Sequence, residues 1–171
     1  IASGMRLPIV LTVVNRALSS PLNIHCDHSD GMGARDSGWL QFYAESGQEA
    51  YDNTIKSLKI AEHKDLLLPV MSCQDGFITG HGVERVGILP DEAVREFVGS
   101  YDPEHYLLDT DHPVTMGAWD FTDYYFEHKR QQSEAINNSM PVILEVCEEY
   151  ERLSERPQPI LDCYGMDDAE L

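Results

Sequence analysis

Residues 23–39 form the part of the chain that is richest in side chains able to do chemistry. Within this stretch, NIHCDHSDGMGARDSGW, imidazole, thiol, carboxylate and guanidinium groups are separated mostly by small residues. Such groups can bind a metal ion, transfer protons, or form a polar loop against a ligand that another part of the protein supplies. The residues concerned are His25, Cys26, Asp27, His28, Asp30, Arg35 and Asp36.

A metal site is the first alternative. Two histidines lie three positions apart in this stretch, and two aspartates beside them add oxygen ligands. Zinc sites usually need a further ligand from a distant part of the chain, and His81 is the candidate for that role. In an extended strand, however, His25 and Asp27 would face one side and His28 the other. Because short clusters of His and Asp often form hydrogen-bonding loops, we predict that no metal is bound here.

A nucleophilic site is the second alternative. Cys26 has histidine neighbours in the sequence, but no arrangement that would activate its thiol is visible. The chain lacks the GxSxG elbow, the GxGxxG dinucleotide motif and the P-loop. None of its four cysteines belongs to a CxxC pair, which argues against a zinc knuckle and against iron–sulfur ligation. Nucleophilic catalysis and nucleotide binding by these devices are therefore not predicted.

Arg16 comes two residues after the apolar run Leu7–Val14 and is the strongest single candidate for a ligand-binding side chain. A guanidinium at the end of a buried strand can bind a small carboxylate through two parallel hydrogen bonds. The same guanidinium can instead pair with Asp27, Asp30 or Asp36 and hold the loop in place. The spacing of these residues favours neither alternative over the other.

Two short apolar runs, Leu7–Val14 and Leu66–Cys73, predict strands that are buried on both faces. The aromatic segment 38–46 predicts a third strand, and 22–26 a further short extended piece. Continuous apolar strands that alternate with helices are typical of parallel sheets, so we predict an α/β fold with a parallel sheet covered by helices. The loops that leave the carboxyl ends of such strands line the ligand crevice, which gives residues 23–39 a functional position.

The segments on either side of the second apolar run are predicted to be a helix and a turn. The helix covers Gln48–Glu62 and connects the parallel strands, with Ser46 as its N-cap and Glu49 three residues later. Around Asp75 and His81, the segments DGF and GHG are more typical of turns than of catalysis. The apolar face of the helix is marked by Ala50, Ile55, Leu58 and Ala61.

The second half of the chain has a different pattern. A helix is predicted over Asp91–Gly99, followed by an extended arm over residues 102–118, where prolines and histidines interrupt any sustained period. A long helical pattern then runs from Phe121 to Leu153. Pro141 is expected to kink this helix or to start a second one.

The chain carries a formal net charge of −18, which is unevenly distributed. Residues 1–101 hold 8 basic and 13 acidic side chains, whereas residues 102–171 hold 4 and 17. Such a surface repels phosphate backbones and anionic membranes, so neither nucleic acid nor a membrane is expected as a partner. No secretory signal and no apolar span of about 18 residues is found. Together with buried, reduced thiols expected at Cys73 and Cys147, this predicts a cytoplasmic protein.

The two ends of the sequence suggest a piece of a longer polypeptide. The chain begins with IASGMRLPIV, which lacks an initiator methionine and is already apolar, and it ends with DCYGMDDAEL. We therefore expect further domains in the parent protein.

Long stretches of the sequence resemble the pyruvate:ferredoxin (flavodoxin) oxidoreductase family, also called pyruvate synthase. The resemblance lies in VVNRALSSPLNIHCDHSD and SGQEAYDNTI and continues through VERVGILPDEAVREFVG, so that it covers nearly the whole chain. It is to the alpha subunit, in the domain that contacts the pyrimidine ring of thiamine diphosphate. It implies that residues 1–101 are the C-terminal part of this domain and that residues 102–171 are an acidic arm and linker helix leading to the next domain.

The resemblance also implies an activity and the partners it needs. Enzymes of this family convert pyruvate and coenzyme A reversibly to acetyl-CoA and carbon dioxide, and electrons leave through iron–sulfur clusters to ferredoxin or flavodoxin. Thiamine diphosphate is shared with another subunit or domain, which is usually the beta subunit and also holds the magnesium ion. Gamma and delta subunits or equivalent domains complete the complex, and the chain is not expected to be active alone.

For individual residues the resemblance implies a binding site without a catalytic group. Arg16 matches the family arginine that binds the pyruvate carboxylate. Asp27, His28, Asp30 and Arg35 belong to the active-site loop that borders the thiamine and the substrate. The family glutamate that activates the pyrimidine would lie upstream of residue 1, and no diphosphate motif or cluster-binding cysteine is found in the sequence.

Two other functions remain open at this point. One is a related oxidoreductase for a different 2-oxoacid, because any 2-oxoacid offers the same carboxylate to Arg16. The other is a non-catalytic interaction module, for which the acidic second half would be the evidence.

Overall fold

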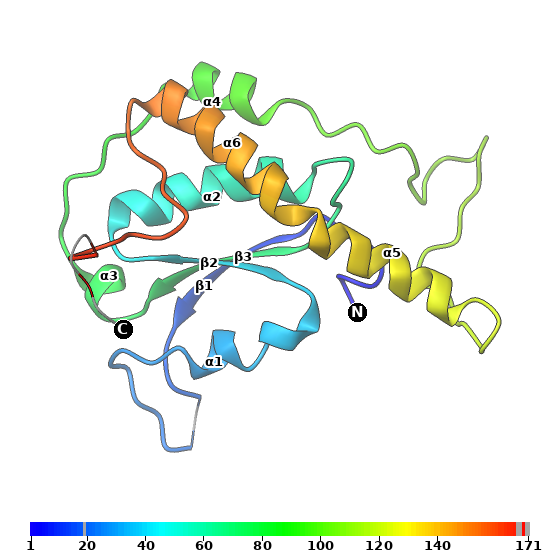
Figure 1. Ribbon diagram of the computed structural model, residues 1–171, viewed down its shortest axis with the longest axis horizontal. Coiled ribbons are helices and arrows are strands. Elements are labelled where there is room, and N and C mark those ends of the chain that lie inside the picture. The colour runs from blue at the N-terminus through cyan, green and yellow to red at the C-terminus, as the bar shows by residue number, and fades with distance from the viewer. Residues whose placement is uncertain (19, 167–168, 170–171) are drawn as a thin grey trace.

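The computed structural model of the chain describes residues 1–18, 20–166 and 169. Three parallel strands form one sheet, and the longer helices lie over one of its faces (Figure 1). The predicted α/β class with a parallel sheet is therefore confirmed. In chain order the elements are β1 (Val10–Asn15), α1 (Ser29–Met32), the 3-10 turn η1 (Arg35–Ser37), β2 (Leu40–Ala44), α2 (Gly47–Ala61), β3 (Val70–Asp75), α3 (Ile78–His81), α4 (Asp91–Val98), α5 (Tyr125–Asn137) and α6 (Ser139–Ser154).

The sheet has the order β1-β3-β2, so that β3 lies in the middle. Both outer strands pair with β3 in parallel, with Val10 and Leu40 each opposite Val70. The connection from β2 through α2 to β3 is a βαβ unit, in which α2 is the predicted crossover helix. The predicted parallel pairing of the first and third strands is confirmed, whereas the expected extended piece at residues 22–26 forms no strand.

β1 is more exposed than its apolar sequence predicts. Leu11 is 44% exposed and Val14 is 50% exposed, so the prediction that this strand is buried on both faces is wrong. The reason is its place in the sheet: among the described residues β1 has a hydrogen-bonded neighbour on one side only, and the long helices do not cover both of its faces. Central β3, in contrast, has residues 70–73 buried, as predicted.

α2 begins and ends within one residue of the prediction. The Ser46 hydroxyl accepts a hydrogen bond from the backbone N–H of Glu49 at 3.2 Å, and the Glu49 carboxylate accepts one from the N–H of Glu45 at 2.9 Å. These bonds satisfy donors at the helix start that have no acceptor within the helix. The predicted apolar face is only partly right, because Leu58 is 36% exposed whereas Ile60 is fully buried. This helix packs against the sheet on one side and against α4 and α6 on the other.

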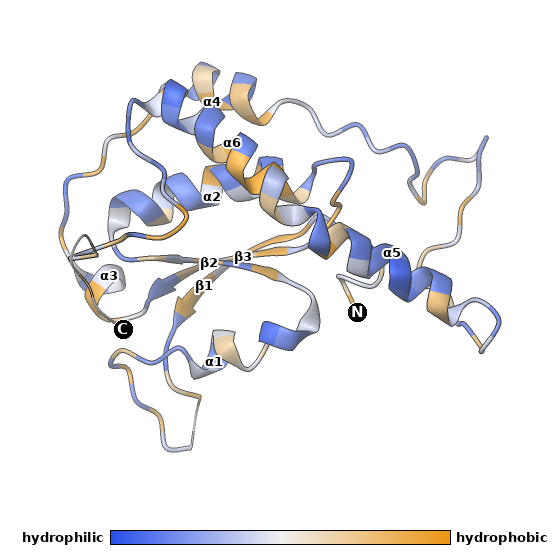
Figure 2. Ribbon diagram, in the orientation of Figure 1, coloured by the Kyte–Doolittle hydropathy of each residue, from blue (hydrophilic) through white to orange (hydrophobic). Residues whose placement is uncertain are grey.

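The hydrophobic core lies between the sheet and the layer formed by α2, α4 and α6. Figure 2 shows apolar residues along the strands and on α6, and a largely hydrophilic α5. Because α6 contributes to the same core as the strands, the C-terminal helix is part of the folded unit. The buried core residues are Ile55, Ile60, Ala61, Leu66, Leu68, Val70, Phe97, Ala135, Val142, Ile143, Val146, Cys147 and Tyr150.

The interface between α2 and the end of α6 contains a buried carboxylate, Asp52. Arg156 donates to both of its oxygens, from Nε to Oδ2 at 3.1 Å and from Nη2 to Oδ1 at 2.6 Å. The Tyr150 hydroxyl and the Gln48 amide also donate to Oδ1, at 2.8 Å and 3.0 Å. Burial alone would raise the pKa of Asp52, but these donors outweigh it and hold the pKa below its usual value. The segment after α6 is thereby fastened to α2.

The second half of the chain agrees with its predicted pattern. Within residues 102–118 the structure has neither helix nor strand, and α4 ends one residue before the predicted limit. The long helical segment is divided into α5 and α6 at Asn138. Pro141 lies in the first turn of α6, where its missing N–H removes no helical hydrogen bond. Of the two alternatives expected at Pro141, a kink or a second helix, the structure shows the second.

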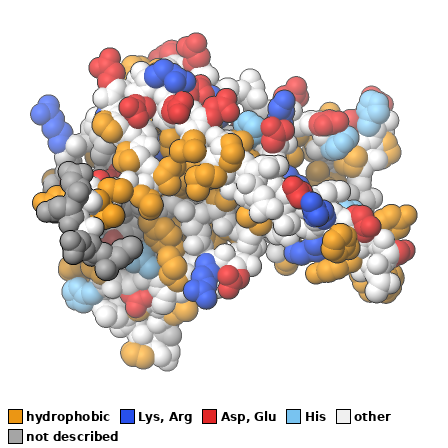
Figure 3. Space-filling model, in the orientation of Figure 1, with side chains coloured by type: hydrophobic (Ala, Val, Ile, Leu, Met, Phe, Trp, Pro, Cys, Tyr) orange, Lys and Arg blue, Asp and Glu red, His pale blue; other side chains and the backbone are white. Residues whose placement is uncertain are grey.

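Acidic side chains gather on the surface over α4 and the C-terminal part of α6, at the top of the view in Figure 3. This acidic surface combines side chains from residues 1–101, in α4, with side chains from residues 102–171, in α6. None of the helices in the described part of the chain is long and apolar enough to cross a membrane.

Candidate functional site at the carboxyl edge of the sheet

Arg16 follows the last residue of β1 and lies exposed at the carboxyl edge of the sheet. Its guanidinium donates one hydrogen bond, from Nη1 to the backbone carbonyl of Ala17 at 3.2 Å. Among the described residues it forms no ion pair with a carboxylate. The alternative in which this guanidinium holds the loop by pairing with Asp27, Asp30 or Asp36 is therefore not the arrangement of the structure.

The backbone of Arg16, and not its side chain, is bound by Asp30. Asp30 Oδ2 accepts the Arg16 N–H at 3.1 Å, and Oδ1 accepts the side-chain amide of Asn15 at 2.8 Å and the N–H of Gly31 at 2.6 Å. Burial by itself would raise the pKa of Asp30, but the hydrogen bonds from these donors and the nearby His28 hold it below the usual value. The end of β1 and the start of α1 are thus joined through one carboxylate.

Asp27 and His28 begin α1 beside this junction. Asp27 Oδ1 accepts the N–H of Ser29 at 2.7 Å. Hydrogen bonding from the Ser29 side chain, followed by this backbone bond, holds the pKa of Asp27 below its usual value. The His28 ring lies edge-on to Tyr43 of β2, with ring centroids 5.5 Å apart. Both predicted loop residues therefore lie near the carboxyl ends of the strands, together with Arg16 and Asp30.

The loop after β3 completes this edge. Asp75 Oδ1 accepts the N–H groups of Phe77 and Ile78 at 2.8 Å and 2.5 Å, which confirms the predicted turn. Burial acts to raise the pKa of Asp75, but these two bonds and the neighbouring Cys26 and His28 hold it below its usual value. His25 packs edge-on against Phe77 with centroids 4.4 Å apart, so the loops after β1 and β3 touch.

Two buried oxygens at this edge have no hydrogen-bond partner among the described residues: Asn15 Oδ1 and Asp75 Oδ2. Asn15 is fully buried and Asp75 is 8% exposed. Neither was singled out as a ligand-facing residue by the sequence, because an asparagine at a strand end and an aspartate before glycine are common in ordinary turns. A ligand that reached this edge with N–H donors would find two acceptors there.

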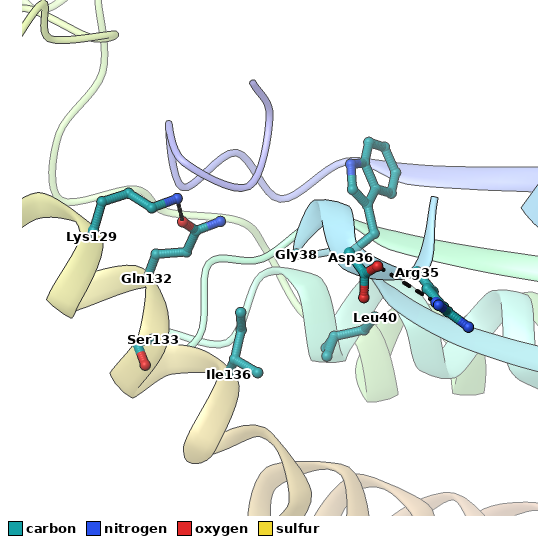
Figure 4. A pocket seen from close by; sticks show the side chains of 9 residues that line it. Arg35, Asp36, Gly38, Leu40, Lys129, Gln132, Ser133 and Ile136 are labelled. Atoms are coloured by element: carbon teal, nitrogen blue, oxygen red, sulfur yellow. Dashed lines mark hydrogen bonds and ion pairs between the residues drawn. The ribbon is translucent and has the colours of Figure 1, made fainter. Parts of the chain in front are cut away.

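Arg35 is the one candidate residue that the structure places elsewhere. It lies in η1, before the amino end of β2, and its Nε is 3.5 Å from Asp36 Oδ2, with both side chains largely exposed (Figure 4). Here it borders a pocket of about 360 Å³ between η1 and α5, which also contains Trp39 and Lys129. The segment after β1 thus runs from the carboxyl edge to the amino edge of the sheet, and proximity in sequence to Asp30 does not bring Arg35 to the same site.

The described residues include no group of three or more His, Cys, Asp and Glu side chains arranged to hold a metal ion. The two histidines of the loop take different partners: His25 contacts Phe77, and His28 contacts Tyr43. The site therefore offers one exposed guanidinium and several acceptors on a fixed sheet edge. An exposed guanidinium of this kind can bind and orient a carboxylate.

The sequence has clear relatives. A model of the family described as "Pyruvate flavodoxin/ferredoxin oxidoreductase, thiamine diP-bdg" matches residues 1–148. Pyruvate synthase subunit PorA of Thermotoga maritima is 57% identical over 170 residues, which cover 99% of this chain and 43% of that protein. Pyruvate synthase subunit PorA of Methanocaldococcus jannaschii is 49% identical over 172 residues, with 99% and 44% covered.

A relative named for a different substrate is also found. Ketoisovalerate oxidoreductase subunit VorA of Pyrococcus abyssi is 35% identical over 171 residues, which cover 99% of this chain and 43% of that protein. The chain therefore spans less than half of the length of the curated relatives it matches.

Proposed function

Since this chain belongs to the pyruvate flavodoxin/ferredoxin oxidoreductase family, in its thiamine diphosphate-binding part, we propose that it is part of the alpha subunit of a pyruvate synthase. The reaction is the coenzyme A-dependent oxidative decarboxylation of pyruvate to acetyl-CoA and carbon dioxide, with electrons passed to ferredoxin or flavodoxin. The structural observation that carries the proposal is the exposed Arg16 guanidinium, which lies at the carboxyl edge of a parallel sheet without an acidic partner among the described residues.

Arg16 is the substrate clamp in this proposal. The carboxylate of a 2-oxoacid is planar and singly charged, and a guanidinium can bind it through two parallel hydrogen bonds. Asp27, His28 and Asp30 border the substrate side of the loop. Arg35 belongs to the other end of the same segment and has no direct role in the clamp.

The same edge suits the pyrimidine half of thiamine diphosphate. An aminopyrimidine carries N–H donors, and the buried acceptors Asn15 Oδ1 and Asp75 Oδ2 have no donor among the described residues. The sequence holds no diphosphate motif and no cluster-binding cysteines. We therefore assign the diphosphate, its magnesium ion and the iron–sulfur clusters to other subunits or domains. When bound, thiamine diphosphate supplies the nucleophilic carbon and the electron sink for decarboxylation, while this chain orients the substrate.

A different 2-oxoacid is the second candidate substrate, because a carboxylate clamp serves all members of the class. The VorA relative, named for ketoisovalerate, is 35% identical. Pyruvate is favoured because two relatives with 57% and 49% identity are pyruvate synthase subunits.

The domain organisation and the partners are part of the same proposal. Residues 1–101 form the C-terminal part of the pyrimidine-binding domain, and residues 102–171 form an acidic arm and a linker helix, which packs on the core of the same folded unit and leads toward the next domain. Beta, gamma and delta subunits or equivalent domains supply the missing parts of the active site. Free cysteines at all four positions are in keeping with a reducing compartment, which for this complex is the cytoplasm.

The test is an assay of the assembled complex that contains the full-length subunit. Pyruvate, coenzyme A and thiamine diphosphate together are expected to reduce an added low-potential acceptor such as ferredoxin, and omission of any one of them is expected to stop the reaction. Residues 1–171 alone are expected to show no turnover. A parallel series with 2-ketoisovalerate shows which of the two substrates is preferred. If the assembled complex had no thiamine-dependent activity on either, the proposed enzyme function would be wrong and the non-catalytic interaction module would remain.

A further inference from the structure

The position of Arg16 in the structure depends on its backbone. Its guanidinium contacts only the carbonyl of the next residue, Ala17, at 3.2 Å. A long exposed side chain of this kind has many rotamers, and holding it in one place costs conformational entropy. The groups that fix the Arg16 backbone therefore limit the range of positions that its guanidinium can take relative to a bound carboxylate.

Asp30 fixes the Arg16 backbone. Its carboxylate accepts the Arg16 N–H at 3.1 Å and the Asn15 amide at 2.8 Å, and it accepts the N–H of its own neighbour Gly31 at 2.6 Å. Asn15 is fully buried as the last residue of β1. The Asp30 side chain therefore binds the start of α1 both to Asn15, in the sheet, and to Arg16, the first residue after β1.

The packing around Gly31 holds Asp30 at this distance. A Cβ atom at position 31 would lie 2.9 Å from Asn15 Nδ2 and 3.0 Å from the Tyr43 hydroxyl, so a larger residue there would require one of these side chains to move away from α1. The side chain of Gln41 donates to the Gly31 carbonyl at 3.0 Å, which ties α1 to β2 as well. The carboxylate thus reaches Arg16 from an element that is bound to two strands.

We propose that Asp30 is the positioning residue for the substrate clamp: it holds the Arg16 backbone so that the guanidinium points to the carboxylate of a 2-oxoacid. This inference rests on the proposed function of Arg16. Asp30 touches no substrate in this role and acts only through Arg16. Removing the Asp30 carboxylate therefore weakens substrate binding and orientation. The same removal has little effect when the Arg16 guanidinium is already absent.

The experiment uses the full complex and four variants of the subunit: Asp30→Asn, Arg16→Ala, the double variant, and Asp109→Asn. Asp109 is a matched control, because its carboxylate also accepts two backbone N–H groups, of Asp111 and His112 at 3.0 Å each, but in the arm far along the chain. The Asp30→Asn variant is expected to lower kcat/KM for pyruvate about tenfold, mainly through KM, whereas Asp109→Asn is expected to leave kcat/KM unchanged. In the Arg16→Ala background, Asp30→Asn is expected to lower kcat/KM by less than twofold, because residues that act through one another are not additive.

Each outcome decides something different. If Asp30→Asn lowers kcat/KM equally with and without Arg16, its role is structural and the inference is wrong. If Arg16→Ala is strongly impaired and Asp30→Asn is not, the inference is wrong and the clamp stands. If Arg16→Ala is unimpaired, the proposed clamp itself falls, and the inference with it. Should Asp30→Asn fail to assemble, Asp30→Glu replaces it: the longer carboxylate shifts the Arg16 backbone, and a loss of kcat/KM that vanishes in the Arg16→Ala background is expected.

Discussion

Asn15 and Asp75 are directly opposite each other in β1 and β3, and each has one buried side-chain oxygen without a hydrogen-bond partner among the described residues. Side chains of paired residues in a parallel sheet point to the same face, so the Asn15 and Asp75 side chains lie on one face of the sheet. A buried acceptor that is left unpaired costs about 1–3 kcal/mol of stability. The carboxyl ends of β1 and β3 are therefore less stable than they would be if a donor were bound to each of these two oxygens.

Replacing Asp75 tests this relationship. In Asp75→Asn the amide keeps an oxygen for the N–H groups of Phe77 and Ile78 and adds a donor beside Asn15 Oδ1. We expect the free energy of unfolding to change by less than about 0.5 kcal/mol or to rise. Asp75→Ala removes the acceptor for both N–H groups and is expected to cost about 1–3 kcal/mol. Urea denaturation of both variants measures the difference, and equal destabilisation by the two would contradict the expected donor effect.

The Arg16 clamp predicts a kinetic defect without a stability defect. Arg16→Ala in the intact complex is expected to cost about 2–4 kcal/mol in kcat/KM for pyruvate, the range for loss of one preorganised charged donor. Arg16→Lys is expected to recover only part of this, because an ammonium cannot form the two parallel bonds. Since the guanidinium has no acidic partner among the described residues, the melting temperature should hardly change. Steady-state kinetics and a melting curve on the same preparation distinguish the substrate clamp from a structural role. A lowered melting temperature with normal kinetics would mean that Arg16 only stabilises the loop.

Acid should weaken the α2–α6 interface. The pKa of Asp52 is below its usual value in the folded protein, so this carboxylate contributes stability that is fully present above the ordinary carboxyl pKa of about 3.9 and is lost as the pH falls through the folded value. The free energy of unfolding should therefore decline below about pH 4, and less steeply in Asp52→Asn, which starts lower at neutral pH. Glu148→Gln is the control, since Glu148 is exposed on α6 and forms no hydrogen bond or ion pair within the described part of the chain. Identical slopes for Asp52→Asn and the wild type would argue against this account.

The four cysteines should differ in reactivity. Cys26 and Cys163 are exposed, whereas Cys73 and Cys147 are buried. Burial raises the pKa of the Cys73 thiol to about 11 and also raises that of Cys147, so neither forms the reactive thiolate near neutral pH. A thiol reagent at pH 8 is expected to label the two exposed cysteines of the native subunit quickly and the other two only after denaturation. Rapid native labelling of Cys73 would mean that β3 opens readily.

Much of the fold is predictable because strong local patterns agree with it. The apolar run around Val70 and the capping of α2 by Ser46 need no information from distant residues. Pro141 marks the start of α6 for an equally local reason, its missing N–H. The excess exposure of β1 could not be predicted, because an apolar run gives no sign of whether a strand lies at the edge or in the middle of a sheet.

The site was less predictable, because it depends on how a loop runs through space. The sequence indicates Arg16 and Asp30, but it does not show that Asp30 binds the Arg16 backbone and leaves its guanidinium free. Arg35 is only five positions from Asp30, yet α1 and η1 carry it toward the other edge of the sheet. Asn15 was missed since its importance comes from burial and from its partner across β1 and β3, neither of which leaves a mark in the sequence.

The central place of β3 has a consequence for synthesis on the ribosome. β1 and β2 are synthesised before β3, but in the finished sheet neither pairs with the other, and both pair with β3. Until residue 75 has left the exit tunnel, β1 and β2 therefore each lack the neighbour that β3 provides, and unpaired strand edges promote aggregation. Among the described elements α2 is the long helix that is complete by then, and its packing against both β1 and β2 allows it to cover these strands before β3 is added.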